Sequence, residues 1–130
     1  MREIKFRGKR VDNGEWVYGF YIQKQNPLKE NGKPIVHWIV DVAPFGYKVI
    51  EETVGQFTGL YDKKGKEIYE GDIVVGYGTW NLIVSIEKGH TVIKWTDYDL
   101  SKQCVYLERE WINGEEAVVI GNIHDNKELL

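Results

Sequence analysis

The stretch GQFTGLYDKKGKEIYEGDIV, residues 55–74, carries two clear turn signals within this chain of 130 residues. Residues 62–65, Asp-Lys-Lys-Gly, have the residue types of a type I turn that is closed by a left-handed glycine. We therefore expect residues 60–69 to form a β-hairpin. Residues 70–72, Glu-Gly-Asp, then predict a second tight turn that leads into a strand beginning at Ile73.

The sequence downstream of this stretch continues in short segments. Residues 82–87 and 91–95 flank Lys88-Gly89, which predicts a hairpin. Residues 101–112 fit both helical and strand spacing, and the Asn113-Gly114 pair favours a strand from 104 to 112 that pairs with residues 117–120. Near the end, Asp125 with Glu128 three residues later predicts the cap of one helical turn.

Upstream, residues 2–23 predict a hairpin around Asp12-Asn13-Gly14. A two-residue loop would set Lys5, Arg7 and Lys9 opposite Ile22, Phe20 and Tyr18. A three-residue loop with a left-handed Gly14 instead pairs Phe6 with Phe20 and Ile4 with Ile22. We favour the second register, because it gives the hairpin one apolar, aromatic face and one basic face.

Between these hairpins, the chain alternates loops and strands. The apolar run IVHWIVDV, residues 35–42, predicts a strand that is covered on both faces. Residues 24–33 read as a polar loop and residues 41–47, with Pro44, as a turn. A further strand is expected over residues 49–57.

The composition agrees with a β-rich, folded and soluble protein. Aromatic residues make up 13%, and 14 glycines against 3 prolines supply turns. The length fits one domain, residues 1–130, with subdomains at 1–54 and 55–130. We expect a mainly β fold in which an N-terminal β-hairpin region packs on a small, partly open barrel, with at most one or two short helical turns.

The sequence contains no recognisable catalytic set. Its three histidines, His37, His90 and His124, have no paired spacing, and the single cysteine, Cys104, has an apolar setting. One cysteine also excludes an intramolecular disulfide, which agrees with a cytoplasmic location. No apolar run is long enough to span a bilayer, and residues 1–10 contain no apolar core of the kind that a signal peptide has. We expect neither a cofactor nor catalysis.

Three carboxylates, Glu67, Glu70 and Asp72, fall within six residues. A hard cation takes oxygen ligands of this kind, so the group is a candidate metal site. Glu70-Gly71-Asp72 also has the residue types of a tight turn in which aspartate accepts backbone hydrogen bonds. The pattern favours the turn.

The first strand carries the main electrostatic feature of the sequence. The net charge is −3, yet residues 1–32 hold seven Lys and Arg against four Asp and Glu, whereas residues 33–130 hold ten against sixteen. Lys5, Arg7, Lys9 and Arg10 are candidates to contact phosphates, and Tyr21 to stack on a base. The alternative is structural, since charges on a surface strand also prevent aggregation at a sheet edge.

Three blocks carry a resemblance to a known family: MREIKFRGK at the start, residues 55–74, and VIGNIHDNKELL at residues 119–130. Together they resemble the YopX family of phage and prophage proteins. Lys127 departs from the family pattern, in which the terminal turn often has proline. The resemblance implies a mainly β protein whose second half is an SH3-like barrel entered at residues 70–74. It implies no activity and no site residues.

The resemblance and the residues together lead to a first hypothesis. We expect a phage or prophage accessory protein in the cytoplasm of a bacterial host, without contact to a membrane. It would be a non-catalytic module that binds a phage or host protein, and it would self-associate through exposed strand edges. The alternative is a nucleic-acid-binding protein that uses the basic hairpin. A third hypothesis is a metal-dependent nuclease that uses Glu67, Glu70 and Asp72.

Overall fold

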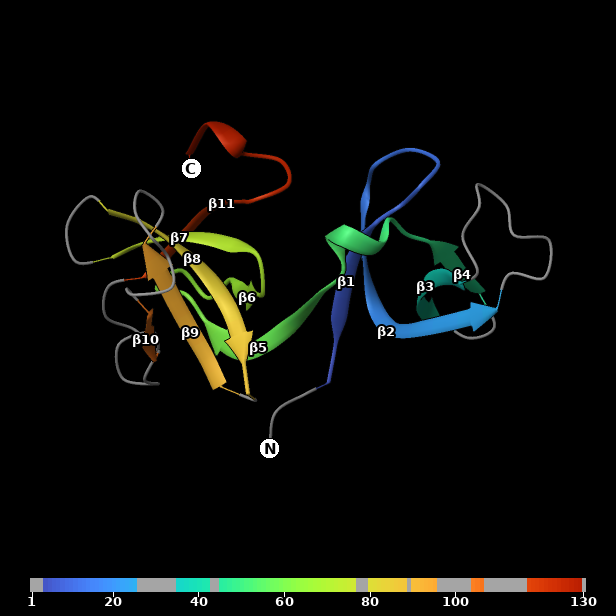
Figure 1. The fold of residues 1–130 in the computed structure, drawn as a ribbon, viewed down its shortest axis with the longest axis horizontal. Coiled ribbons are helices and arrows are strands. Elements are labelled where there is room, and N and C mark those ends of the chain that lie inside the picture. The colour runs from blue at the N-terminus through green and yellow to red at the C-terminus, as the bar shows by residue number, and fades with distance from the viewer. Residues whose placement is uncertain are drawn as a thin grey trace. The chain divides into compact units, whose positions relative to one another are not determined.

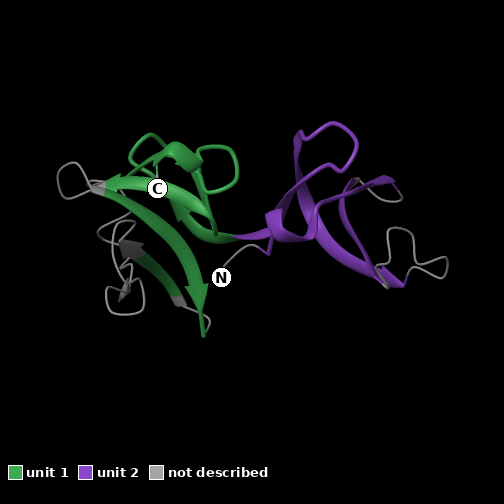
Figure 2. Cartoon of the chain, turned by 45° about the horizontal axis from the view of Figure 1, so that its top comes forward, with its two compact units in different colours: residues 1–2, 57–130 green, residues 3–56 purple. Residues whose placement is uncertain are grey.

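The computed structural model describes residues 4–25, 35–42, 45–76, 80–88, 90–95, 104–106 and 117–129. It divides into two compact units (Figure 2). The N-terminal unit comprises Glu3–Gln56, and the C-terminal unit comprises Phe57–Leu130 together with Met1–Arg2. Both units are built from antiparallel strands, so the prediction of a mainly β fold is confirmed, and the strands that the structure describes do not close into a barrel.

The N-terminal unit is one curled sheet. Its strands pair in the order β4-β3-β2-β1, followed by the first residues of β5. Their bounds are β1 (Phe6–Lys9), β2 (Trp16–Gln25), β3 (Ile35–Val42), β4 (Phe45–Lys48) and β5 (Gly55–Tyr61), with a single 3-10 turn, η2 (Glu51–Thr53), before β5. Two predictions are wrong here. Residues 45–48 form a strand where part of a turn was expected, and the 3-10 turn at residues 51–53 interrupts the strand that was expected over residues 49–57.

The β1–β2 hairpin forms as predicted, but its register is shifted by one residue. Phe6 pairs with Gly19, not Phe20, and Lys9 pairs with Trp16. The reason is the length of the turn: Arg10 N donates to Glu15 O at 2.9 Å, so four residues lie between them. Gly14 is left-handed (φ 73°), as expected. A shift of one residue moves each partner to the other face, so the predicted separation into an aromatic face and a basic face is wrong.

β2 changes partner at Gly19. Its first four residues pair with β1, and its last six pair with β3 from Phe20 onward. A Cβ atom at Gly19 would lie 2.2 Å from the carbonyl oxygen of Val40. The missing side chain therefore lets the backbone of β3 approach β2 where β2 changes partner. Figure 1 shows that β2 is bent along its length.

The curl of this sheet brings the end of β1 to the residues that follow β4. Arg10 and Val49 form an isolated antiparallel bridge, and Val11 N donates to Lys48 O at 3.0 Å. The inner side is buried at Ile39 and Val49. On the outer side, Phe20, which pairs with Val40 of β3, is 65% exposed, so the prediction that β3 is covered on both faces is wrong.

The C-terminal unit contains the predicted hairpin of residues 60–69. β5 pairs with β6 (Glu67–Tyr69), and Gly65 is left-handed as expected (φ 83°). A five-stranded sheet follows in the order β10-β9-β8-β7-β11 (Figure 1). These strands are β7 (Asp72–Gly76), β8 (Trp80–Glu87), β9 (His90–Trp95), β10 (Cys104–Tyr106) and β11 (Val118–Asn122). Leu60 and Ile68 join the core of this sheet, which includes Val74, Leu82, Val84, Ile93 and Ala117.

Residues 104–106 form a strand, but the predicted pairing of this segment with residues 117–120 is wrong. β10 pairs with β9, whereas β11 pairs with β7 at the other edge of the sheet. The Asn113-Gly114 turn and the rest of the 101–112 segment lie outside the described residues. The expected helical turn near the end is a 3-10 turn, η4 (Lys127–Leu129). Among the described residues, no helix combines the length and apolarity needed to cross a membrane.

Candidate binding face of the N-terminal unit

The outer side of the N-terminal sheet carries a row of aromatic and apolar side chains. Residues directly opposite each other in a ladder share a face, and alternate residues of a strand return to that face. The pairing of β1 to β4 therefore assigns side chains from all four strands to this side, which we call the aromatic face. They include Trp16, Tyr18, Phe20, Ile22, Trp38, Val40, Arg7, Lys9, Lys24 and Lys48.

The aromatic face combines exposed rings with positive charge. Phe20 is 65% exposed, and Tyr18 and Ile22 are also exposed. At the described strand positions on this face, four cations occur and no carboxylate. A surface of this kind attracts polyanions, because positive charges gathered on one face add to each other's field.

The cations lie over the two tryptophans of the aromatic face. The guanidinium of Arg7 is 4.6 Å from the ring centroid of Trp16, and Lys9 Nζ is 5.8 Å from it. Lys24 Nζ and Lys48 Nζ lie 5.1 and 5.7 Å from the ring of Trp38. At these distances a cation is attracted to the face of an aromatic ring, so positive charge and aromatic surface lie side by side.

The structure brings only part of the predicted basic site together. Arg7 and Lys9 lie on the aromatic face, but Arg7 is only 6% exposed and so contributes charge more than direct contact. Lys5 is half-buried and precedes β1. Tyr21 points to the inner side, where its hydroxyl is hydrogen-bonded to His37 Nδ1 at 2.6 Å and its ring packs 5.5 Å from that of Phe6.

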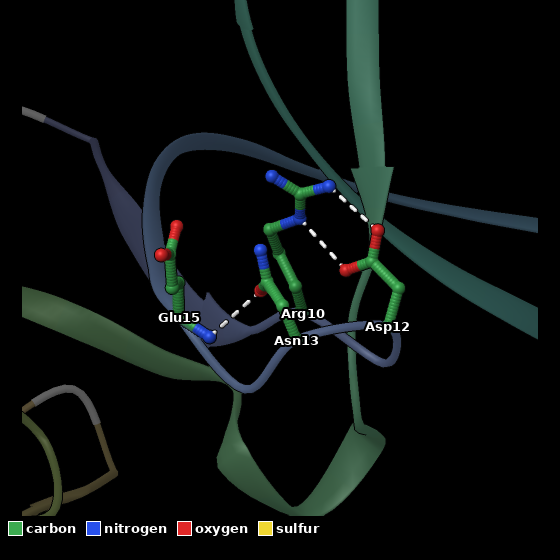
Figure 3. A network of polar contacts seen from close by, with 4 residues as sticks. All are labelled: Arg10, Asp12, Asn13 and Glu15. Carbon is green, nitrogen blue, oxygen red and sulfur yellow. Dashed lines mark hydrogen bonds and ion pairs between the residues drawn. The ribbon is translucent and has the colours of Figure 1, made fainter.

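Arg10 belongs to the turn between β1 and β2 (Figure 3). Its Nε donates to Asp12 Oδ1 at 2.9 Å and its Nη2 to Asp12 Oδ2 at 2.6 Å. The hydrogen bond from Arg10 lowers the pKa of Asp12, so this carboxylate stays ionised and neutralises the guanidinium. In the same turn, Asn13 Oδ1 accepts a hydrogen bond from Glu15 N. Arg10 thus fixes the turn and adds little net charge for a phosphate.

A pocket of about 300 Å³ lies beside this turn. We call it the turn pocket; it is lined by Arg10, Val11, Asp12, Trp38, Gly46, Tyr47 and Lys48. Trp38 and Lys48 also belong to the aromatic face. The guanidinium of Arg10 lies 4.5 Å from the ring of Tyr47, which orders the pocket wall. The turn pocket is therefore an aromatic cavity at the end of the aromatic face.

Carboxylates of the predicted metal site accept hydrogen bonds within the fold. Asp72 is 1% exposed, and its Oδ2 accepts a hydrogen bond from Tyr69 N at 2.8 Å. Glu67 Oε1 accepts one from the hydroxyl of Tyr69 at 3.1 Å. Within the part of the chain that the structure describes, no group of three His, Cys, Asp or Glu residues is placed to hold a metal ion. The turn interpretation of Glu70-Gly71-Asp72 thus accounts for the geometry.

The chain is similar to known proteins along nearly its whole length. A family model described as YopX protein matches residues 5–130. This chain belongs to the YopX family. The crystal structure of protein EF1440 from Enterococcus faecalis is similar, with a TM-score of 0.56 and 22% identity over 100% of this chain and 99% of that one. At this identity the likeness concerns the fold alone. No curated protein matches the chain.

Sequence reasoning predicted an aromatic face on the first hairpin of this YopX-family chain but missed the cations that lie on it. The signal was present in β2, where Trp16, Tyr18, Phe20, Ile22 and Lys24 occupy every second position. What the sequence did not reveal was that this row shares its face with Arg7 and Lys9. That fact depends on the register of the first hairpin.

Proposed function

We propose that this YopX-family chain is a non-catalytic binding protein that holds single-stranded nucleic acid on the aromatic face. The observation that supports this function is the combination of exposed rings with four cations and no carboxylate at the described strand positions on one side of a sheet. Bases stack on aromatic side chains whatever their sequence, and lysines beside those rings neutralise the phosphates between the bases.

The charge distribution favours a single strand over a long duplex. The N-terminal unit contains eight Lys and Arg against seven Asp and Glu, whereas the C-terminal unit contains nine against thirteen. A duplex hides the faces of its bases in its own stack and would extend beyond the small basic area. A short single strand offers both bases and phosphates to the aromatic face.

The family resemblance supports the setting that we propose. We place the protein as a phage or prophage accessory protein inside the bacterial host cell, where it would act on single-stranded intermediates without chemical conversion of them. We favour nucleic acid over the protein partner that was expected from sequence, because positive charge and aromatic surface coincide on one face.

The first test measures binding of a fluorescent oligothymidylate of about 12 nucleotides, a length within the usual site sizes for single-strand binders. We expect fluorescence anisotropy to show binding that weakens as salt is added. A plot of log affinity against log salt concentration should have a slope of about −2, the value for phosphate contacts from Lys9, Lys24 and Lys48. Absence of binding at low salt would contradict the proposal. Recovery of a phage or host protein on the tagged chain would then support the protein partner.

A pair of phenylalanine variants tests the location of the binding site. Phe20→Ala is expected to weaken oligothymidylate binding by about 5- to 150-fold, because one stacked base contributes about 1–3 kcal/mol. Phe20 is 65% exposed, so its removal leaves no cavity in the core. Phe45→Ala is the matched control, since Phe45 is 70% exposed in the same unit but alternates with Gly46 and does not lie on the aromatic face. Equal losses for the two variants would contradict the assigned face.

A second pair tests the charge contribution. Lys24→Glu is expected to weaken binding and to make the salt dependence shallower by about 0.7 in slope, the value for one lost phosphate contact. Lys64→Glu makes the same charge change in an exposed turn of the C-terminal unit and should leave the slope unchanged. A parallel loss in both variants would indicate that net charge alone governs binding.

A further inference from the structure

We infer that the turn pocket holds one nucleotide of the bound strand, with its base against Trp38 and its phosphate at Lys48. This inference rests on the proposed function and assigns a defined subsite to it. It adds a cavity to what is otherwise an open stacking surface.

The turn pocket is continuous with the aromatic face. Trp38 pairs with Ile22 across β2 and β3 and so belongs to the aromatic face, and it also lines the turn pocket. A strand that follows the row of rings along β2 therefore reaches the pocket without leaving aromatic surface.

The walls of the turn pocket combine aromatic rings with a lysine. Trp38 and Tyr47 supply aromatic surface, and Lys48 Nζ lies 5.7 Å from the Trp38 ring. A base on that ring would place its phosphate within reach of a lysine ammonium, which acts as a mobile point charge. Gly46 lines the same pocket, and a Cβ atom there would lie 3.5 Å from the Trp38 ring, so the missing side chain keeps this surface open.

The two charges of the turn that borders the pocket are paired. Arg10 and Asp12 neutralise each other, so the pocket wall offers hydrogen-bond donors and acceptors with little net charge. Every nucleobase carries both donors and acceptors on its edge, so the wall suits a base without selecting one.

The size of the pocket fits a small ligand. About 300 Å³ is at the lower end of the range of roughly 300–1,000 Å³ that is typical of ligand pockets. One nucleotide is therefore the expected occupant, and the neighbouring nucleotides would remain on the open aromatic face.

The experiment compares three ligands on the full chain by isothermal titration and by amide chemical shifts: AMP, ribose 5-phosphate and the oligothymidylate. We expect AMP to bind at least about tenfold more tightly than ribose 5-phosphate, within the range expected of base stacking. AMP should shift the amides of Val11, Gly46 and Lys48. Tyr47→Leu should weaken both AMP and the oligothymidylate, whereas Tyr61→Leu, an exposed tyrosine in the C-terminal unit, should weaken neither.

The outcomes separate the pocket from the aromatic face. Equal binding of AMP and ribose 5-phosphate would overturn the nucleotide pocket, because the base would then contribute nothing. If the oligothymidylate still binds in that case, the proposed function stands. Base-dependent binding of AMP without binding of the oligothymidylate would overturn the strand proposal and assign the pocket to free nucleotides. Weakening of AMP alone by Tyr47→Leu would also contradict a strand that passes through the pocket.

Discussion

Gly19→Ala is expected to lower the free energy of unfolding of the N-terminal unit by about 3 kcal/mol, the upper end of the usual cost of overpacking. The added Cβ would lie 2.2 Å from the Val40 carbonyl oxygen and 2.7 Å from its carbonyl carbon. These are backbone atoms of β3, so no side-chain rotation can relieve the clash. β2 would have to separate from β3 at the point where it changes partner.

The measurement is native-state hydrogen exchange at the amide of Ile39, which is buried in β3 and reports on this unit separately from the rest of the chain. Gly14→Ala is the control. Gly14 is left-handed at φ 73°, and beyond its chain neighbours nothing lies within 4 Å of the position that a Cβ would take. Only the backbone conformation therefore opposes alanine there, at a cost of about 1 kcal/mol. If both variants lose the same protection, the close approach of β2 and β3 is not what requires glycine at position 19.

Asp62→Ala is expected to lower the free energy of unfolding of the C-terminal unit by about 3 kcal/mol, roughly 1 kcal/mol for each of three hydrogen bonds. Asp62 is 5% exposed. Its Oδ1 accepts from Lys64 N at 2.8 Å and Lys66 N at 2.9 Å, and its Oδ2 accepts from Val119 N at 3.0 Å. One carboxylate therefore closes the β5–β6 turn and ties it to β11.

The lowered pKa of Asp62 also predicts how the free energy of unfolding depends on pH. Burial opposes its ionisation, but hydrogen bonds from the amides of Val119, Lys66 and Lys64 outweigh burial and lower its pKa in the folded chain. Asp62 therefore contributes its full stabilisation above about pH 3.9, the pKa of an aspartate in an unfolded chain. That stabilisation is lost as the pH falls through the lower pKa of Asp62 in the folded chain.

Urea unfolding from neutral to acidic pH, read through exchange at the amide of Ile73, which is buried in β7 of the same unit, measures this contribution. Asp62→Asn should remove the pH dependence that comes from this group and should cost less than Asp62→Ala, because one oxygen still accepts. Lys64→Ala, which keeps the backbone donor of the same turn, should change stability by less than about 0.5 kcal/mol. A loss for Lys64→Ala equal to that of Asp62→Ala would contradict the role of the carboxylate.

The parts of the fold that depend on local chemistry were predictable from sequence. The hairpin of residues 60–69 and the left-handed Gly65 follow from a short run of turn residues, and both are confirmed. The partners of β10 and β11 were not predictable, because they depend on contacts between distant segments and on the order of the whole sheet. Local signals identify strands but do not choose between the edges of a sheet.

The candidate site also depended on information that local sequence signals do not carry. The residue types were visible, but the predicted hairpin turn was one residue too short, since the bonds that involve Arg10, Asp12 and Asn13 stabilise a longer turn. That single residue moved Arg7 and Lys9 from an expected basic face onto the face of Trp16 and Tyr18. Tyr21 moved away from them to the inner side, beside His37. A small error in a turn thus changed which side chains form a site.

The central proposal, single-stranded nucleic acid on the aromatic face, is tested most directly by titrating the isotope-labelled full chain with the oligothymidylate and following amide and indole resonances. We predict shifts at the indole N–H groups of Trp16 and Trp38 and at the amides of Tyr18 to Ile22, with the amides of β7 and β8 unchanged. Shifts confined to the C-terminal unit, or no shifts at saturating ligand and low salt, would contradict it.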